Sequence, residues 1–456
     1  MTLKEYIKSI ADKKVTVIGM GISNTPLIEY LLENNIDTTI CDRADRARLG
    51  ANADRFEKLG ARLSLGETYL DNIDADIIFR TPGLRPDMDG ILKAVEKGAV
   101  LTSEMELFFD VCPCRKIAVT GSDGKTTTTT IISELLMAAG YTVHVGGNIG
   151  TPLLTKADEM KEDDIVVLEL SSFQLMTMKK SPDVAVITNL APNHLDIHKD
   201  MEEYLNAKKN IYLHQNESGK LIVNLDNDIT KALTGNGDTF HFSRREKVEG
   251  GCYCVDGEIF ASFGGKTEKI MDAKDIFLPG VHNIENYLAA FSAVYGIVPI
   301  EVMKTVATEF TGVEHRIEFV RNLRGVSYYN DSIASSPSRT TAGLRSFTKK
   351  VILMAGGKDK GVPFDDLGTE ICEHVKSLVL TGYTAEKIKA ATEKSPLYDG
   401  FPIAVIESFE DAVRYCAKIA EDGDIVIMSP ASTSFDRFRN FMERGDLFKK
   451  IVNELE

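Results

Sequence analysis

The sequence lacks any apolar run of the length that a membrane-spanning helix requires, which is roughly 18 residues. Its first residues, MTLKEYIKSIADKK, also lack the apolar core of a signal peptide, because charged residues occur throughout them. Positive charge is in deficit: 53 lysines and arginines stand against 68 aspartates and glutamates, for a formal net charge of -15. Such a surface repels polyanions, which argues against nucleic acid and anionic membranes as partners. We therefore expect a cytoplasmic protein without membrane insertion.

Cysteine is scarce, with seven residues in the chain, and the odd number does not form the dense framework of a disulfide-rich protein. The pairs Cys112/Cys114 and Cys252/Cys254 have a spacer of one residue, shorter than the spacer of two or more that is typical of zinc ligands. Isolated thiols in a reducing compartment are the better interpretation. The chain also has no low-complexity segment and no repeat of about 20 to 50 residues, so a solenoid is not expected.

The sequence contains instead one pattern in three blocks: a short β-branched run, a glycine turn and a helical segment. The alternation GCYCVDGEIFASF, at 251–263, adds antiparallel hairpins to the second block. We predict an α/β protein of three domains. They are a Rossmann-like N-terminal domain (1–104), a central P-loop ATPase-like domain with a mixed sheet (105–312) and a Rossmann-like C-terminal domain (313–456).

The first block opens with VTVIGMGIS, Val15 to Ser23, followed by a helical segment and a second strand that ends on Asp42. This arrangement resembles a dinucleotide-binding fold. The third glycine of the usual G-x-G-x-x-G motif is replaced by Asn24, so a bare turn stays open as an interpretation.

The second block contains IAVTGSDGKT, a strand followed by a glycine-containing turn, a lysine and a run of threonines. Gly121 and Gly124 allow successive backbone N–H groups to point at an anion, and the following helix adds its N-terminal dipole. Lys125 supplies a cation for phosphates, and Thr126 supplies a hydroxyl for magnesium. The usual G-x-x-x-x-G-K-[ST] motif is incomplete, because Val119 stands where its first glycine belongs. The threonines from Thr127 onward are expected to pack in the helix, with Thr127 alone also near a nucleotide.

Two further groups lie at strand ends of the second block, where ligands of open α/β sheets gather, and a third lies in a helical segment. Glu169 in LELSS is a candidate metal ligand, and NHLDIH supplies His194, Asp196 and His198. A helical segment, NAKKNIY, supplies Lys208 beside a second lysine. Taken alone, the histidines are typical of a structural turn and the lysines of a solvated basic face.

Together these motifs resemble the Mur ligases, the ATP-dependent amide ligases that build the peptide of the bacterial cell wall. The shortened phosphate loop of that family, TGxxGKT, matches Thr120 to Thr126 and accounts for the missing glycine. Further matching stretches lie in all three blocks: GGNIGTP (146–152), LELSSFQL (168–175), NHLDIH (193–198), NAKKNIY (206–212), PGVHNIENYLAA (279–290) and EHRIEFV (314–320). Within the family, MSPASTSFDRFRNFMERGDLF (428–448) and the first-block TPG and SEMELFF resemble the members that add D-glutamate.

The resemblance implies a monomeric ligase that joins D-glutamate to UDP-N-acetylmuramoyl-L-alanine through an acyl phosphate, using ATP and two magnesium ions, in peptidoglycan precursor synthesis. Its catalytic residues would be Lys125, His194 and Lys208. ATP would be bound by Gly121, Ser122, Asp123, Gly124, Lys125, Thr126, Thr127, Asn283, Asn286, Arg316 and Asp331. Magnesium would be bound by Thr126, Glu169, His194 and Lys208, the last as a carbamate. The UDP-linked substrate would contact Ser23, Asn24, Asp42, Arg43, Gly83 and Asn148, and D-glutamate would contact Lys360, Ser434 and Phe441.

Two positions depart from the pattern of the family. The third block reads NDSIAS where many members have NDSKAT, so Ile333 replaces a lysine near the acyl phosphate. Asn193 stands where an aspartate usually precedes the metal-binding histidine. Because the substrates are expected between blocks, we also expect the third block to close onto the second during turnover.

Three other functions stay open on the sequence alone. The first is another ligase of this group, such as a folylpolyglutamate-type synthase. The second is a nicotinamide-dependent dehydrogenase, suggested only by GMGISN. The third is a nucleotide-sensing protein that uses ATP as a switch without forming an amide.

Overall fold

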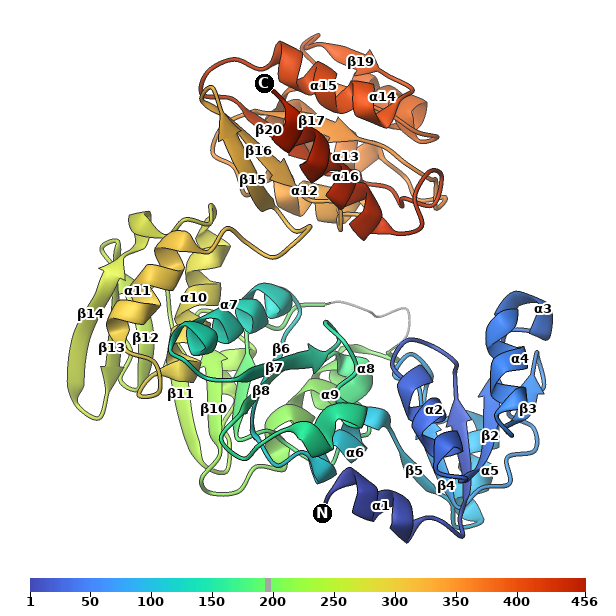
Figure 1. The fold of residues 1–456 in the computed structure, drawn as a ribbon. Coiled ribbons are helices and arrows are strands. Elements are labelled where there is room, and N and C mark those ends of the chain that lie inside the picture. The colour runs from blue at the N-terminus through green and yellow to red at the C-terminus, as the bar shows by residue number, and fades with distance from the viewer. Residues whose placement is uncertain (193–197) are drawn as a thin grey trace. The chain divides into compact units, whose positions relative to one another are not determined.

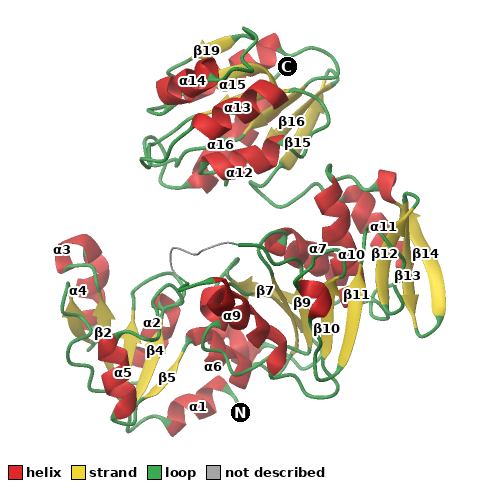
Figure 2. Cartoon of the chain, turned by 180° about the vertical axis from the view of Figure 1, so that it is seen from behind, coloured by secondary structure: helices red, strands yellow, loops and turns green. Residues whose placement is uncertain are grey.

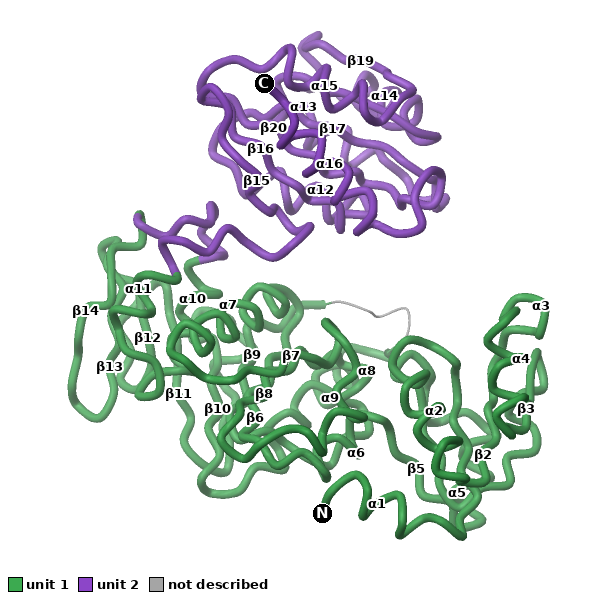
Figure 3. Tube along the Cα trace, in the orientation of Figure 1, with its two compact units in different colours: residues 1–274, 284–306 green, residues 275–283, 307–456 purple. Residues whose placement is uncertain are grey.

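The computed structural model describes residues 1–192 and 198–456, which form three α/β domains with five- or six-stranded sheets and a small three-stranded sheet (Figure 1). The chain divides into two compact units (Figure 3). Unit 1 contains residues 1–274 and 284–306, and unit 2 contains residues 275–283 and 307–456. The predicted α/β class with three sheet domains is confirmed, while the boundaries after residues 104 and 312 stay predictions.

The N-terminal sheet of unit 1 has the strand order β3-β2-β1-β4-β5, and all its pairs are parallel. Its strands are β1 (Lys14–Ile18), β2 (Asp37–Asp42), β3 (Arg62–Leu65), β4 (Ile77–Arg80) and β5 (Val100–Thr102). Its helices are α1 (Leu3–Ser9), α2 (Thr25–Glu33), α3 (Arg46–Leu49), α4 (Ala51–Lys58), α5 (Asp89–Glu96) and α6 (Glu104–Val111). The strand order reverses between β1 and β4, and such a switch point is where open α/β sheets bind ligands.

The central sheet of unit 1 has the order β11-β10-β9-β6-β8-β7. Its strands are β6 (Arg115–Thr120), β7 (Val143–Gly147), β8 (Ile165–Glu169), β9 (Val184–Ile187), β10 (Lys220–Asn224) and β11 (Asp238–Phe242). The helices around it are α7 (Lys125–Ala138), η1 (Leu154–Glu159), α8 (Ser172–Leu175), α9 (Met201–Leu213), η2 (Thr230–Ala232), η3 (Ala273–Asp275), α10 (Val281–Val294) and α11 (Ile300–Glu309).

The central sheet differs in one respect from the mixed sheet expected for this domain. All its strand pairs are parallel. The antiparallel hairpins form a separate sheet from β12 (Gly251–Val255), β13 (Glu258–Phe263) and β14 (Lys266–Asp272). The strands of the parallel sheet are buried almost throughout, as β8 and β9 show, because helices cover both faces of such a sheet.

The N-terminal and central sheets belong to one packed body. A single hydrophobic cluster runs from Ile7 in α1 through Phe108 in α6 to Leu153 before η1. The backbone N–H groups of Leu3 and Lys4 at the start of α1 donate to the carboxylate of Asp158 in η1, at 2.7 and 3.1 Å. The carboxyl edges of these two sheets are therefore held in a fixed relation.

Unit 2 contains a sheet of order β15-β16-β20-β17-β18-β19, which is parallel except for the hairpin of β15 with β16. Its strands are β15 (Glu318–Leu323), β16 (Val326–Asn330), β17 (Val351–Ala355), β18 (Val375–Leu380), β19 (Ile403–Val405) and β20 (Ile425–Met428). Its helices are α12 (Pro337–Leu344), α13 (Asp365–His374), α14 (Ala385–Lys394), α15 (Phe409–Ile419) and α16 (Phe441–Glu454).

Helices cover the strands of each sheet domain (Figure 2). The longest in the described part of the chain are α7, α10 and α16, with 14 residues each. Nowhere in residues 1–192 or 198–456 is a helix both long and apolar enough to span a membrane.

Candidate active site

The loop between β6 and α7 is bent so tightly that two of its positions accept only glycine. Gly121 and Gly124 have φ angles of +151° and +77°, where a side chain is strained. A Cβ atom on Gly121 would lie 2.0 Å from the Thr188 hydroxyl oxygen, and one on Gly124 would lie 2.3 Å from the Asn286 amide oxygen. The predicted phosphate loop is therefore present as a preformed bend at the N-terminus of α7, whose dipole favours an anion.

The segment after β9 holds this loop from one side. The Asp123 N–H donates to the side-chain oxygen of Asn189 at 3.0 Å, and the Thr188 hydroxyl donates to the Asp123 carbonyl. The Ser122 hydroxyl donates to the Ala191 carbonyl and accepts from the Ala191 N–H, both at 2.9 Å. The sequence interpretation missed Thr188 and Asn189. Their position directly after β9, which pairs with β6, was the signal that could have identified them.

Tyr204 in α9 also supports the phosphate loop, through Ser122. Its hydroxyl lies 2.9 Å from the Ser122 hydroxyl. Because Ser122 uses its only proton on the Ala191 carbonyl, the Tyr204 hydroxyl is the donor in this pair. Tyr204 is fully buried, and sequence reasoning did not identify it.

Two of the predicted metal ligands lie together at the carboxyl edge of the central sheet. The Thr126 hydroxyl donates to one carboxylate oxygen of Glu169 at 2.7 Å, and the Asn148 amide donates to the other at 2.8 Å. The Glu169 side chain is buried, whereas Asn148 is exposed. A hydroxyl and a carboxylate beside a phosphate loop are the hard oxygen ligands that magnesium prefers.

Lys208 does not lie on a solvated basic face. Helix α9 begins at Met201 because the Asp200 side chain caps it, and it carries Lys208 to a position where only 2% of the residue is exposed. The Lys208 ammonium donates to the Gly121 carbonyl at 2.8 Å and to the Thr120 hydroxyl at 3.2 Å. Burial, and then the nearby charge of Lys125, hold the pKa of Lys208 well below its ordinary value. The neutral amine of Lys208 is therefore accessible.

Lys125, at the first position of α7, lies back over the phosphate loop. Its ammonium donates to the Ser122 carbonyl at 2.9 Å. The threonines that follow pack as predicted, with Thr127, Thr128 and Thr129 buried in α7. Thr127, which was predicted to contact ATP, is therefore a buried residue in the first turn of α7.

Of the predicted histidines, His194 lies outside the described residues, as do Asn193 and Asp196 of the same motif. His198 is buried, and its Nε2 lies 2.9 Å from the Ser172 hydroxyl. Its ring stacks on Phe173 with centroids 5.3 Å apart. These contacts fit the structural role that a turn histidine usually has.

The two predicted asparagines near α10 make different contacts. Asn286 is buried and accepts a hydrogen bond from the Thr128 hydroxyl at 3.3 Å, so it adjoins the phosphate loop within unit 1. The Asn283 amide donates to the Pro279 carbonyl at 2.6 Å within unit 2.

In unit 2, Asp331 is a buried carboxyl directly after β16. It accepts from the Ser429 hydroxyl at 2.7 Å and from the Ile317 N–H at 3.3 Å. Burial raises the pKa of Asp331 to about 7, against the opposing attraction of Arg316. Ile333 stands where many members of the family have a lysine, but a cation lies near it: the Arg339 guanidinium donates to the Ile333 carbonyl at 3.3 Å.

The residues predicted for D-glutamate lie on neighbouring loops of unit 2. Lys360 is exposed in the loop after β17, and Ser434 is buried in the loop after β20. These two loops pair through the Lys358 N–H, which donates to the Thr433 carbonyl at 2.8 Å. Phe441, at the start of α16, accepts from the Ser332 hydroxyl at 2.7 Å through its carbonyl, and so joins the loop after β16 to this group.

The residues predicted for the UDP-linked substrate lie at the carboxyl edge of the N-terminal sheet, apart from Asn148. Asn24 is buried and its amide donates to the Ile18 carbonyl at 3.0 Å. Asp42 accepts from the N–H groups of Met20 and Ala44, each at 2.8 Å, and so joins two loops. Ser23 is half-buried, and Arg43 and Gly83 are exposed at the same edge.

Comparison with protein families gives two matches. Residues 119–294 match the family described as Mur ligase middle domain. Residues 315–432 match the family described as Mur ligase, glutamate ligase domain.

Among named proteins, the chain is similar over its full length to UDP-N-acetylmuramoylalanine--D-glutamate ligases. The protein of that name from Acetivibrio thermocellus is 53% identical, covering 100% of this chain and 99% of its own. The protein of that name from Clostridium novyi is 50% identical with the same coverage.

Among solved structures, UDP-N-acetylmuramate-alanine ligase from Thermotoga maritima has a TM-score of 0.55 at 18% identity, covering 97% of this chain and 99% of that one. A pseudomurein peptide ligase type C from Methanothermus fervidus also has a TM-score of 0.55 at 18% identity, covering 97% and 100%. At these identities the likeness supports the fold alone.

Replacing Tyr204 by phenylalanine tests its support of the phosphate loop. The change removes the hydroxyl that donates to Ser122 and leaves the ring in place. We expect the affinity for a nucleoside triphosphate to fall by about 3-fold to 10-fold, since a net hydrogen bond contributes about 1 kcal/mol. Titration calorimetry measures the change. Tyr212→Phe, which removes a buried hydroxyl from the same helix, is the matched control, and equal affinities of the two variants would contradict the assigned role.

Replacing Asp331 by asparagine tests the buried carboxyl of unit 2. A carboxyl whose pKa rises on folding from 3.8 to about 7 contributes stability at low pH that is lost as pH rises through about 7. The loss begins once the unfolded carboxyl ionises above about pH 3.8, so we expect Asp331→Asn to stabilise the protein by on the order of 2 kcal/mol more at about pH 8 than at about pH 5.

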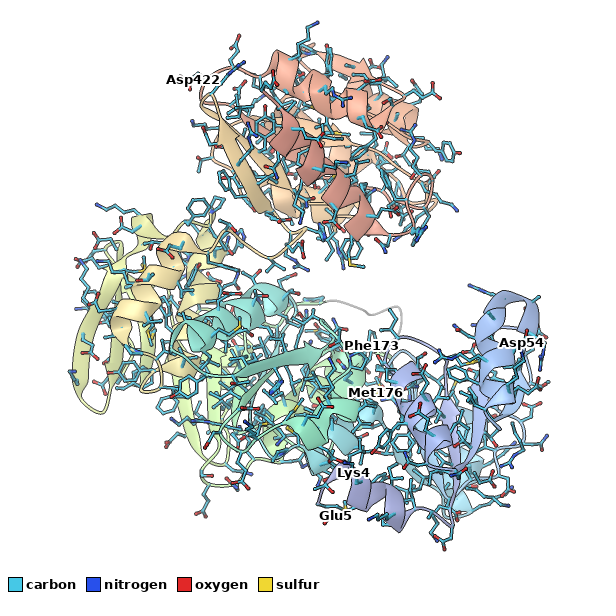
Figure 4. All side chains as sticks on the ribbon, viewed as in Figure 1. Lys4, Glu5, Asp54, Phe173, Met176 and Asp422 are labelled. Carbon is cyan, nitrogen blue, oxygen red and sulfur yellow. The ribbon has the colours of Figure 1, made fainter. Side chains whose placement is uncertain are left out.

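The unfolding temperature at the two pH values measures the effect of this substitution. The exposed Asp422 provides the control substitution Asp422→Asn in the same unit (Figure 4). A difference between Asp331→Asn and the unaltered protein that is the same at both pH values would count against a titrating Asp331.

Proposed function

The chain belongs to the Mur ligase family, and from this premise we propose that it is the ATP-dependent ligase that joins D-glutamate to UDP-N-acetylmuramoyl-L-alanine in peptidoglycan precursor synthesis. The observation that carries the proposal is the grouping at one sheet edge of the glycine bend at 121–124, the Thr126–Glu169 pair and the buried Lys208. The full-length likeness to ligases of that name supports D-glutamate as the amino acid.

The phosphate loop fits a triphosphate. Its two glycines bring the backbone closer than a side chain would permit, and α7 places its N-terminus there. The Lys125 ammonium donates to the Ser122 carbonyl within the loop, and from there it can turn to the terminal phosphates. We assign Gly121 to Thr127 to ATP, together with Asn283, Asn286, Arg316 and Asp331.

The site also fits magnesium. The Thr126 hydroxyl and the Glu169 carboxylate, 2.7 Å apart, would hold one ion, and His194 and a carbamylated Lys208 would serve a second. Bound magnesium supplies positive charge that offsets the repulsion between the substrate carboxylate and the triphosphate. Lys208 fits this role only after its amine has taken up CO₂, because an ammonium repels a cation whereas a carbamate provides anionic oxygens.

In the proposed reaction the carboxylate of the alanyl substrate attacks the γ-phosphorus of ATP, and ADP leaves. The acyl phosphate that forms is then attacked at its carbonyl carbon by the amine of D-glutamate, and inorganic phosphate leaves as the amide forms. Lys125 stabilises negative charge on the transferred phosphoryl group. The surrounding loops orient the two reacting groups, which replaces a bimolecular encounter by a prearranged one.

The remaining assignments are parts of the same proposal. The UDP-linked substrate contacts Ser23, Asn24, Asp42, Arg43, Gly83 and Asn148. D-glutamate contacts Lys360, Ser434 and Phe441. The enzyme works as a cytoplasmic monomer with two magnesium ions.

Product analysis tests the proposed function directly. The protein is mixed with ATP, magnesium, UDP-N-acetylmuramoyl-L-alanine and one amino acid at a time, and the products are identified by mass spectrometry. We expect ADP, phosphate and a new amide with D-glutamate. Lys125→Met should lower the rate by about 100-fold or more, because the site loses its charge on the phosphoryl group. Lys156→Met, on the exposed surface of η1, is the control. ADP without amide would point to a switch protein, and a preference for another amino acid would point to a different ligase.

Replacing Lys208 by arginine tests carbamylation. Arginine keeps the positive charge but cannot form the carbamate, because its guanidinium does not deprotonate in proteins. We expect a loss of activity of about 100-fold or more, and expect labelled bicarbonate to give a carbamate signal in the NMR spectrum of the unaltered protein only. The neighbouring Lys209→Arg is the matched control. Full activity of Lys208→Arg, or of the unaltered enzyme freed of CO₂, would contradict the assignment.

A further inference from the structure

Arg80, the last residue of β4, is a buried cation that none of the assigned functions uses. The residue is 1% exposed. In the described part of the chain Arg80 makes no ion pair, although the charge of Glu106 attracts it and partly opposes the effect of burial on its pKa. Burial lowers the pKa of Arg80 to about 10, so the guanidinium stays charged at neutral pH. Burying a guanidinium without an ion pair costs several kcal/mol unless hydrogen bonds replace its water.

The hydrogen bonds of Arg80 go in two directions. One terminal nitrogen donates to three carbonyl oxygens of the loop that follows β4: those of Thr81 at 3.2 Å, Pro82 at 2.9 Å and Leu84. The other donates across to the central domain, to the Phe173 carbonyl at 3.0 Å and the Thr177 hydroxyl at 3.2 Å. Figure 4 labels Phe173, which lies in α8 of the central domain. One side chain thus fixes the loop and fastens it to the central domain.

The loop that Arg80 fixes lies at the switch point of the N-terminal sheet. The Thr81 N–H donates to the Ile18 carbonyl at 3.1 Å, and a Cβ on Gly19 would lie 3.1 Å from the Thr81 side chain. The loop therefore packs on the segment that leads from β1 to Ser23 and Asn24. It also contains Gly83.

The central end of the same link adjoins the phosphate edge. Helix α8 begins at Ser172, three residues after Glu169, and the ring of Phe173 stacks on His198. A second link supports the first: Arg85, in the same loop, makes two hydrogen bonds of 2.9 and 2.8 Å to the Glu203 carboxylate in α9, the helix of Lys208. Arg85 also contacts Asp87 at 2.9 Å, which orients its guanidinium.

We propose that Arg80 is a positioning residue for the UDP-linked substrate, which sets the loop 81–84 at one fixed place relative to the edge of the central sheet that carries Glu169. This inference rests on the proposed function, because that function places the nucleotide end of the substrate on the N-terminal sheet and its carboxylate at the central one. A shift of the loop would move the carboxylate away from the phosphate, and small misplacements of reacting groups are costly in rate.

The test compares Arg80→Met, Arg80→Lys and Thr177→Val with the unaltered enzyme. Arg80→Met removes every hydrogen bond, Arg80→Lys retains a charge that reaches part of the acceptors, and Thr177→Val removes one acceptor while keeping the shape. We expect kcat/KM for the UDP-linked substrate to fall by about 10-fold to 100-fold in Arg80→Met, with smaller losses in the other two. The KM for ATP and the calorimetric affinity for ATP should stay unchanged.

A purely structural role would give a different result. Phe56→Leu, a core substitution in α4 of the same domain, lowers the unfolding temperature without touching the loop and is the control for lost stability. If Arg80→Met and Phe56→Leu affect kinetics alike, or if the KM values for ATP and for the UDP-linked substrate rise together, the inference is wrong. Should Arg80→Met not fold, Arg80→Lys and Thr177→Val decide by the same criterion. An unaltered protein that makes no amide from this substrate would overturn the proposed function itself, which distinguishes the two failures.

Discussion

The close approach of four chain segments around the bend at Gly121 and Gly124 is the constraint on which the site depends. Strand β6 delivers the bend, Thr188 after β9 and Asn286 in α10 occupy the space that side chains at the two glycines would need, and Lys208 fills the space beneath with a buried amine. Because Thr188 and Lys208 donate to backbone carbonyls of the loop and Asn286 lies against Gly124, the loop is held in shape before any nucleotide arrives. Electrostatic stabilisation of phosphoryl transfer benefits from such preorganisation.

The buried amine of Lys208 connects packing with chemistry. Burial and the charge of Lys125 both disfavour its ammonium form, so the surroundings that bury the residue also favour the neutral amine that the proposed carbamylation requires. Burial acts in the same way on Asp331 in unit 2: it disfavours the charged carboxylate and favours the neutral carboxyl. Both groups are held in a form that costs stability in the ligand-free protein, which is typical of sites built to bind charged ligands.

Fixed geometry between two sheets is as necessary to this reaction as the phosphate loop. The proposed acyl substrate is long, and the proposed function places its two ends on different sheets of unit 1. The shared hydrophobic core, the contact of α1 with Asp158, and the hydrogen bonds of Arg80 all hold these sheets together. Specificity for an extended substrate can thus come from residues that touch no reacting atom, through the distance that they keep between two loops.

The three α/β blocks, the glycine bend and the family were predictable from the sequence, because they depend on local pattern: the order of strand, glycine turn and helix, and the spacing of Gly121, Gly124, Lys125 and Thr126. The remaining features of the site depend on contacts between distant segments of the chain. Lys208 is next to a second lysine in the sequence and so resembled a surface residue, but in the fold it is buried. Thr188 and Asn189 come to lie beside the bend because β9 is the neighbour of β6 in the sheet. Two features have no local signal in the sequence: the hairpins form a sheet separate from the parallel one, and Arg80 bonds to Phe173, 93 residues further on. Such pairing between distant segments is set by the packing of the whole unit.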